Sequence, residues 1–415
     1  MSSEAGRITE FRKSWASLLT ATVGLAVGLV PILFYSLGSF IAPLQAEFGW
    51  SRGDISTAVL FMTIVIALTA PAVGALIDRY GVKTLSLISI PLLAVVLFGI
   101  SRYEGSVLAF QGLYALAALA GLGATPVVYT SIVAGAFDKA RGLALGIAVS
   151  GVAFTTAGLP ILLAMTIQSY GWRGGYVALA ALVLIAWPFM LLMPGRIEKP
   201  VAKKQGMTVD TSVFKLPVFW VLGISFAAIA VAVGAIIVHL VPMLRDAGLT
   251  PIAAAGVAGF IGIGAIFGRL VTGFLIDHFF APYVAAAMFF ITSLSCVLLL
   301  YAGVETAPFA AALTGLSLGA EADLIAYLTA KYFGMVRYGF VYSVLYAMFA
   351  IGAALGPAAA GKAFDISGSY RTTIWTAAAL LALSAIAILR LPRFERFEKQ
   401  NAEKSGAATE MAKSY

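Results

Sequence analysis

Three charged residues lie well inside apolar segments of the sequence: Arg269, Glu321 and Asp323. An ionised side chain at mid-membrane costs about 2.5–3.5 kcal/mol on insertion scales, so such residues are expected to be paired or to face a cavity. A guanidinium offers a fixed fork of donors that matches a carboxylate, and it stays charged at any relevant pH. Burial favours the neutral form of a carboxyl group, which suits a reversible proton carrier. The three residues therefore predict either an anion and proton site or a structural ion pair.

The three charges are predicted to lie at one depth. Arg269 is eight residues from Asp277, whereas Glu321 and Asp323 are ten and eight residues from Lys331. At 1.5 Å per helical residue these separations are roughly 12, 15 and 12 Å. Because two residues along a helix are about 200° apart, Glu321 and Asp323 must point in nearly opposite directions. We expect one acid to neutralise Arg269 and at least one to take up a proton; the sequence leaves open which acid has which role.

The composition indicates a helical membrane protein. The chain has 415 residues, of which 61% are hydrophobic and 11% charged, and its mean hydropathy is +0.97. Soluble domains carry about 25% charged residues. Apolar runs of about 20 residues, long enough to cross a hydrocarbon core of roughly 30 Å, recur along the whole chain. We expect twelve transmembrane helices, over residues 15–44, 54–77, 84–101, 106–136, 141–166, 174–194, 217–244, 251–276, 283–303, 306–331, 340–363 and 372–391.

The basic residues predict the orientation of these helices. If the N-terminus is inside, 20 of the 27 Lys and Arg residues fall in inner segments and six at outer ends. The positive-inside rule then places both termini in the cytoplasm, as expected for a multi-pass protein of the cell inner membrane. Orientation accounts for the net charge of +8, and we expect no nucleic-acid partner. The first residues are polar and the apolar run that follows them is long, so we expect no cleaved signal peptide.

An internal repeat runs through the sequence. Five landmarks of the first part recur with a constant offset of 199 residues: Pro43, Gly49, Ser51, Gly74 and Asp78 correspond to Pro242, Gly248, Thr250, Gly273 and Asp277. A second set recurs with offsets of 196 to 198: Arg141, Pro160 and Arg173 correspond to Arg337, Pro357 and Arg371. We therefore expect two six-helix bundles related by pseudo-two-fold symmetry, 1–194 and 217–391, with a cytoplasmic linker at 195–216 and a cytoplasmic tail at 392–415. Substrate would lie between the bundles, as in parallel-repeat transporters.

The stretch GALIDRYGVK, residues 74–83, resembles the loop 2–3 signature G-x-x-x-D-R-x-G-x-[RK] of the major facilitator superfamily. Three further segments resemble its monocarboxylate and oxalate:formate antiporter-like branches: FGWSRGDIS at 48–56, the Arg-x-x-x-Gly-x-x-x-Asp run at 269–277, and the GWR after the fifth span. The resemblance implies an all-α, twelve-helix fold. It also implies a secondary transporter that moves a small organic anion by alternating access, with proton symport.

The same resemblance assigns a role to Arg269, and other residues within the spans are candidates by their type and position. Arg269 matches the arginine that contacts the anionic substrate in those carriers, and a single fixed positive charge fits a monoanion, or a dianion carried with protons. His239, near the outer end of span seven, is a further candidate for proton coupling beside Glu321 and Asp323. Five tyrosines are further candidates, and each could either contact the substrate or pack against neighbouring helices: Tyr35, Tyr129, Tyr327, Tyr342 and Tyr346.

In the loops, the resemblance implies that Asp78 and Arg79 help latch the outward-open state. Asp277 is the repeat counterpart, although FLIDHFFAP lacks the Gly and the basic residue that follow the first copy. Arg141 and Arg337, at the starts of spans five and eleven, are candidate partners. The alternative is that all five are ordinary cytoplasmic loop charges.

Other chemistry lacks support in the sequence. It has no nucleotide-binding motif, nucleophile elbow or Cys/His cluster, so we expect no enzymatic activity, no cofactor and no metal. The expected partners are a small organic anion, protons and the lipid bilayer, and we expect a monomer. Alternatives to symport are an anion exchanger, a proton-driven exporter of amphipathic compounds, and a non-transporting sensor on the same fold.

Overall fold

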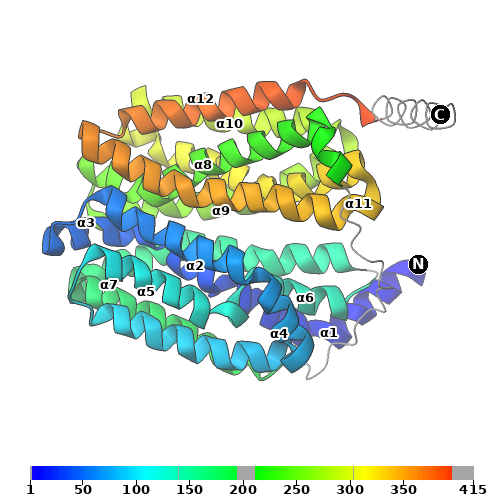
Figure 1. Ribbon diagram of the computed structural model, residues 1–415, viewed down its shortest axis with the longest axis horizontal. Helices are drawn as coiled ribbons and strands as arrows, with labels where there is room; N and C mark the ends of the chain where they lie inside the picture. The colour runs from blue at the N-terminus through cyan, green and yellow to red at the C-terminus, as the bar shows by residue number, and fades with distance from the viewer. Residues whose placement is uncertain (1, 139, 194–210, 302, 395–415) are drawn as a thin grey trace, which may run out of the picture.

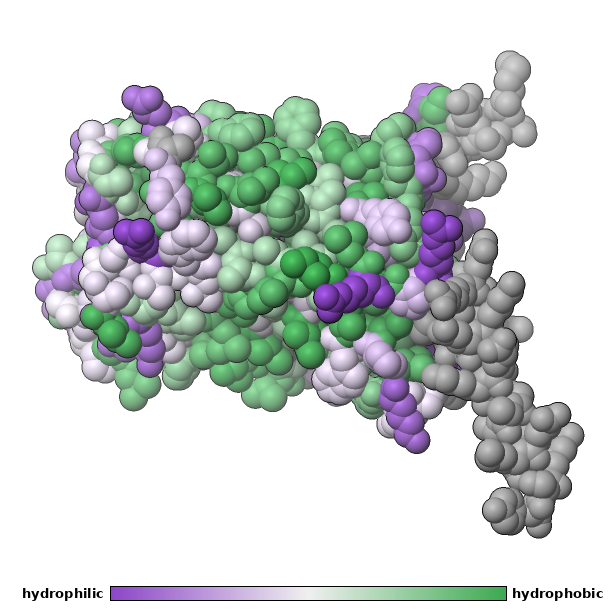
Figure 2. Space-filling view, turned by 90° about the horizontal axis from the view of Figure 1, so that it is seen from above, coloured by the Kyte–Doolittle hydropathy of each residue, from purple (hydrophilic) through white to green (hydrophobic). Residues whose placement is uncertain are grey.

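A computed structural model describes residues 2–138, 140–193, 211–301 and 303–394, and every regular element in these ranges is a helix. This confirms the predicted all-α membrane class. Most of the predicted linker 195–216 and of the predicted tail 392–415 lies outside the described residues. Within the described ranges, nine helices are long and apolar enough to cross a membrane. Figure 2 shows hydrophobic side chains covering the middle of one face, with hydrophilic ones gathered mostly toward its two ends.

The helices lie in two layers (Figure 1). The first bundle comprises α1 (Ser2–Ala26), α2 (Leu29–Leu33), α3 (Leu37–Phe48), α4 (Arg52–Ser101), α5 (Val107–Ala120), η1 (Leu122–Ala124), α6 (Pro126–Ala136) and α7 (Arg141–Met190). The second bundle comprises η2 (Thr211–Lys215), α8 (Pro217–Asp246), α9 (Pro251–His278), α10 (Ala281–Tyr301), η3 (Val304–Thr306), α11 (Ala307–Ser367) and α12 (Arg371–Leu389). One end of the molecule, which we call the terminal end, holds the start of α1 and the end of α12. The opposite end, which we call the far end, holds the end of α3 and the starts of α4 and α12.

Three of the long helices each contain two predicted spans. In α4 the chain changes direction at Gly81, in α7 at Gly171 and in α11 at Gly334. All three glycines have φ between +68° and +78°, a left-handed backbone that residues with a Cβ rarely adopt. The predicted boundaries between these spans fall at or next to the three turns.

Two predicted spans are interrupted rather than continuous. The segment 15–44 breaks around Val27–Gly28 and again before Leu37, and the segment 106–136 breaks between α5 and α6. The breaks pack against each other, because a Cβ on Gly28 would lie 2.8 Å from the carbonyl oxygen of Ala124. Apolar composition alone gives no sign of such a break, since the broken and unbroken segments are equally hydrophobic.

Repeat-related residues share their local geometry. Gly49 and Gly248 both have positive φ, at +69° and +97°. The Ser51 and Thr250 side chains each accept a hydrogen bond from the backbone N–H three residues on, so both cap a helix N-terminus. The two bundles therefore enter their second and eighth predicted spans by the same turn.

Candidate functional site

Helices α9 and α11 touch backbone to backbone in the second bundle. A Cβ on Gly264 would lie 2.0 Å from the carbonyl oxygen of Ala312. Gly268, Gly315 and Gly319 show the same closeness, at 2.1–2.3 Å from carbonyl oxygens of the facing helix. Only glycine permits such an approach, as in the small-residue interfaces of other membrane helices.

This contact brings Arg269 of α9 next to Asp323 of α11. The Arg269 Nε donates a hydrogen bond to Asp323 Oδ2 at 3.0 Å. The two side chains are 23% and 41% exposed, so neither is fully enclosed by the protein. The pair is thus a charge-assisted hydrogen bond in which a solute carboxylate could replace Asp323.

Glu321 has a different environment. It is 2% exposed, and its Oε1 has no hydrogen-bond partner within the described residues. The hydroxyl of Ser317, one turn earlier on α11, is likewise buried and unpartnered within the described ranges. Burying an ionised carboxylate without a partner is expensive, so this setting favours the neutral acid.

Glu321 lines a cavity of about 240 Å³ between the two bundles. Tyr35 and Met62 of the first bundle and Tyr346 of the second also line it. Most other lining residues are apolar, among them Val30, Phe34, Ile66, Val73, Val233, Ile237 and Phe349. The cavity therefore offers a largely apolar chamber with one buried acid in its wall.

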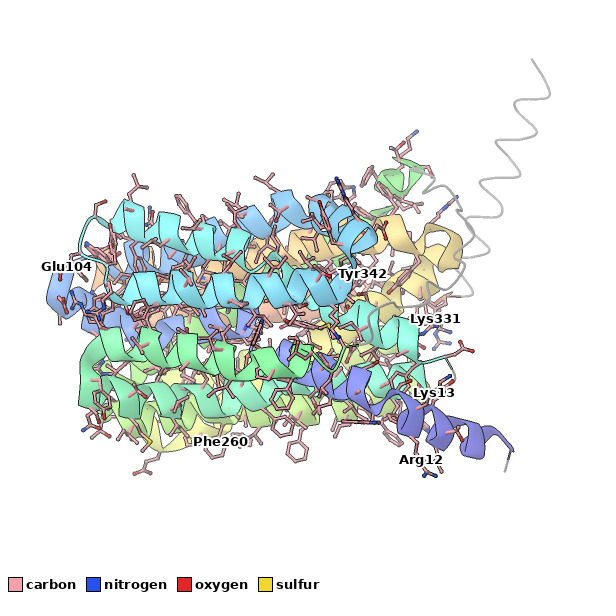
Figure 3. All side chains as sticks on the ribbon, turned by 90° about the horizontal axis from the view of Figure 1, so that it is seen from below. Arg12, Lys13, Glu104, Phe260, Lys331 and Tyr342 are labelled. Atoms are coloured by element: carbon pink, nitrogen blue, oxygen red, sulfur yellow. The ribbon has the colours of Figure 1, made fainter. Side chains whose placement is uncertain are left out.

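Tyrosines connect the cavity with the ion pair. Tyr35 lies within electrostatic reach of Glu321, Tyr346 and Arg269, and Tyr342 lies within reach of Tyr346 and Asp323. Tyr342 and Tyr346 stack with their ring centroids 5.8 Å apart. Figure 3 shows Tyr342 between the middle of the molecule and the terminal end, where Lys331 and Lys13 lie. Arg269, Glu321, Asp323 and three of the five predicted tyrosines thus gather in one region.

The other two predicted tyrosines lie elsewhere. Tyr129 is 1% exposed and is not among the described residues that line the cavity. Its ring packs on Gly24, where a Cβ would come within 2.2 Å of it. Tyr327 donates to the carbonyl of Ile276 at 3.4 Å, and Lys331 Nζ lies 5.6 Å from its ring centroid. Tyr129 therefore packs between helices, and Tyr327 joins α11 to α9.

His239 lies toward the far end, apart from the two acids. It is fully buried, with Nδ1 2.8 Å from the Tyr370 hydroxyl and Nε2 2.9 Å from the carbonyl oxygen of Pro357. A carbonyl can only accept, so we assign the ring proton to Nε2, and Nδ1 accepts from Tyr370. Ser56 Oγ of the first bundle also lies 3.2 Å from Nε2. The ring therefore joins the two bundles.

A charged network closes the far end around Arg52. Its Nη1 and Nη2 bind the two carboxylate oxygens of Asp246 at 2.6 and 2.9 Å, and Nη1 also donates to Tyr370 at 2.9 Å. Asp365 accepts from the backbone N–H groups of Arg52 and Gly53 at 2.9 and 2.8 Å. Sequence reasoning counted Arg52 only as an outer basic residue and missed both acids. The repeat was the available signal, because its 199-residue offset pairs Asp246 with Glu47.

The predicted latch residues lie toward the terminal end. Five side chains are exposed there: Asp78, Arg79, Asp277, Arg141 and Arg337. Arg79 lies over the ring of Tyr80 at 5.2 Å, and Arg141 lies 3.6 Å from Asp138. Their roles as a latch stay predictions. In the described ranges, no group of three or more His, Cys, Asp or Glu residues could hold a metal ion.

Comparison with known proteins gives the family. The chain is 27% identical over 250 residues to monocarboxylate transporter 13 of Bos taurus, covering 59% of this chain and 58% of that protein. It is 26% identical over 273 residues to the oxalate:formate antiporter of Oxalobacter formigenes, covering 62% and 60%. A solved structure of a variant of the nucleoside transporter NupG superposes with a TM-score of 0.71 at 14% identity, covering 90% of this chain and 99% of that chain. In the two sequence comparisons, the match spans less than two thirds of the length of the monocarboxylate transporter and of the oxalate:formate antiporter. The sequence model of the Major Facilitator Superfamily matches residues 23–310, more than half of the chain. The protein belongs to the Major Facilitator Superfamily.

Proposed function

We propose that this protein is a secondary transporter that moves a small carboxylate across the membrane by alternating access, coupled to protons. The observation that carries the proposal is the Arg269–Asp323 pair at 3.0 Å, beside a cavity between the bundles that contains Glu321. The similarity to a monocarboxylate transporter and to an oxalate:formate antiporter supports a carboxylate substrate. A guanidinium that already holds one carboxylate is suited to hold another.

The proposal gives Arg269 and Asp323 complementary roles. With the site empty, Asp323 neutralises Arg269. An incoming carboxylate takes the place of Asp323 on the guanidinium, and Asp323 re-forms the pair when the substrate leaves. Exchange between two carboxylates of similar strength keeps Arg269 paired throughout. The displaced Asp323 is 41% exposed, so its carboxylate is not fully buried when it leaves the guanidinium.

Glu321 is the proposed proton carrier. Its nearly complete burial and unpartnered Oε1 favour the neutral acid in this conformation. Its position in the cavity wall places it beside the path that a substrate would take. Loss of its proton on the opposite side of the membrane would link the gradient to substrate movement.

The two bundles, 1–194 and 217–391, are the proposed moving bodies. The far end is closed by contacts between α4 of the first bundle and α8 and α11 of the second. With both termini in the cytoplasm of the cell inner membrane, as the basic residues predict, this closure corresponds to a state that is shut toward the outside, either inward-facing or occluded. Asp78 and Arg79 would then re-form their latch when the terminal end closes.

A second candidate is a proton-driven exporter of amphipathic compounds. The apolar walls of the cavity favour it, because a large apolar surface suits an amphipathic solute better than a small anion. This reading also uses Glu321, but it gives Arg269 no substrate role. The ion pair, placed beside the cavity by a glycine contact, favours the carboxylate transporter.

The test is uptake of labelled propionate, lactate and oxalate into proteoliposomes, with and without an inward proton gradient. The proposal expects gradient-stimulated uptake of at least one of these anions, inhibited by the others in excess. Uptake driven equally well by a trapped internal anion, with no effect of the gradient, would instead establish an exchanger. Transport of amphipathic compounds without any anion uptake would establish the exporter.

A further inference from the structure

The repeat relates a three-residue cluster in one bundle to a three-residue cluster in the other. Glu47 corresponds to Asp246 at the 199-residue offset. Trp172 and Arg173 correspond to Tyr370 and Arg371 at an offset of 198. Each cluster thus has an acid at the end of one helix. The aromatic residue and the arginine directly follow the turn at Gly171 in one cluster and begin α12 in the other.

In the first bundle the acid is held by the other two members of the cluster, and Arg173 also binds Glu104 at 3.2 Å. Glu47 Oε1 is paired with Arg173 Nη1. Glu47 Oε2 accepts from Trp172 Nε1 at 2.6 Å. The acid therefore has both partners within its own bundle.

In the second bundle the acid has a different partner. Asp246 binds Arg52 of the first bundle through two hydrogen bonds. Arg371, the residue that the repeat assigns to Asp246, is exposed and has no ion pair within the described part of the chain. Asp246 and Arg371 nevertheless line the same surface cavity of about 630 Å³, together with Tyr370. Asp246 and Arg371 therefore face the same open space.

We propose that Asp246 exchanges partners during the transport cycle, binding Arg52 when the far end is closed and Arg371 when it is open. The inference rests on the proposed alternating access. Opening the far end must separate Arg52 from Asp246, since the two belong to different bundles. Pairing with Arg371 gives the carboxylate the arrangement that Glu47 and Arg173 already have, and it spares Asp246 from remaining unpaired. Arg52 is thus a closed-state residue and Arg371 an open-state residue.

The remaining contacts of the far end belong to the closed state alone. Asp365 accepts from the first N–H groups of α4, a favourable place for a negative charge. Gly53 and Gly361 allow the two helices to meet, because a Cβ on Gly361 would lie 2.7 Å from the Gly53 Cα. Both contacts join the two bundles, so both must be lost when the far end opens.

The test measures how often the far end opens, without using any substrate. In a Cys296→Ala background, Ser56→Cys places a thiol at a fully buried position one turn beyond Arg52. The protein is placed in nanodiscs, and the rate of reaction with a hydrophilic maleimide is measured. Because Ser56 is shielded while the far end is closed, faster labelling reports opening.

Four variants are compared in this reporter background. Arg52→Gln removes the closed-state partner and should label about tenfold faster, within the usual range of two-state coupling. Arg52→Gln with Arg371→Gln removes both partners, so labelling should return to within about twofold of the reporter's rate, given couplings of similar size. Arg371→Gln removes only the open-state partner and should label more slowly than the reporter. Arg245→Gln, the adjacent outer arginine, is the matched control and should change nothing.

Each contrary result overturns part of the proposal. If the double variant labels as fast as Arg52→Gln, Arg371 has no open-state role. If Arg371→Gln labels as fast as the reporter, Arg371 does not stabilise the open state. If Arg52→Gln labels no faster than the reporter, the clamp itself is refuted. Should Arg52→Gln fail to fold, Arg52→Lys keeps the charge without the two-pronged geometry, and a smaller acceleration is expected. None of these results depends on which solute is transported.

Discussion

Arg269 and Asp323 face each other across α9 and α11, with Nε 3.0 Å from Oδ2, at a level where the two helices touch through glycine. The ion pair and the glycine contact form one structure. The close approach makes a short bond possible, and the bond keeps two charges paired inside an apolar bundle. A substrate carboxylate that binds Arg269 through Nε therefore competes with Asp323.

Asp323→Asn is predicted to tighten substrate binding and slow turnover. The amide removes the competing carboxylate, so the KM for the transported anion should fall by about tenfold, the size of a typical coupling. Release should become harder because nothing re-forms the pair, so the maximal rate should fall as well. Initial-rate uptake over a range of concentrations measures both. A higher KM would show that Asp323 holds Arg269 in place rather than competing for it.

Glu321→Gln is predicted to uncouple transport from protons. Glutamine keeps the shape of the neutral acid but cannot release a proton. Uptake should no longer respond to an inward proton gradient, whereas exchange of internal for external anion should persist. Asp323→Asn should retain a response to the gradient and is the matched comparison. Gradient-driven accumulation by Glu321→Gln would assign the proton to another residue.

Gly268→Val is predicted to destabilise the second bundle and break the site. A Cβ at Gly268 would lie 2.3 Å from the Leu316 carbonyl oxygen, so α9 and α11 must move apart. Overpacking of this kind costs typically 1–3 kcal/mol, which should lower the melting temperature by several degrees. Gly273→Val on the same helix is the control, since a Cβ there meets nothing within 4 Å. Equal melting temperatures would mean that the contact adapts to a side chain.

Much of the site could be predicted because membrane burial makes charge conspicuous. Arg269, Glu321 and Asp323 stand out in apolar runs, and counting residues from the helix ends placed them at one depth. The 200° separation on one helix predicted that the two acids would differ, and the structure gives one of them the ion pair and the other the cavity. The sequence could not tell which acid forms the ion pair and which lines the cavity, because this depends on how α11 is rotated against α9.

The far end could not be predicted by the same reasoning. Arg52, Asp246 and Asp365 lie at helix ends, where charges are ordinary, so composition gives no reason to pair them. Their contacts depend on how the two bundles meet. Likewise, the breaks at Gly28 and between α5 and α6 follow from backbone packing between helices, which hydropathy does not report.

The most direct test of the central claim is uptake of the transported carboxylate by Arg269→Gln in proteoliposomes. Arg102→Gln, an exposed arginine at the far end, serves as the control. A hydrogen bond to a charged group contributes about 1.5–3 kcal/mol, so uptake by Arg269→Gln should fall at least tenfold while the control stays at the wild-type level. Uptake by Arg269→Gln equal to wild type would contradict the account and leave the Arg269–Asp323 pair as a structural contact.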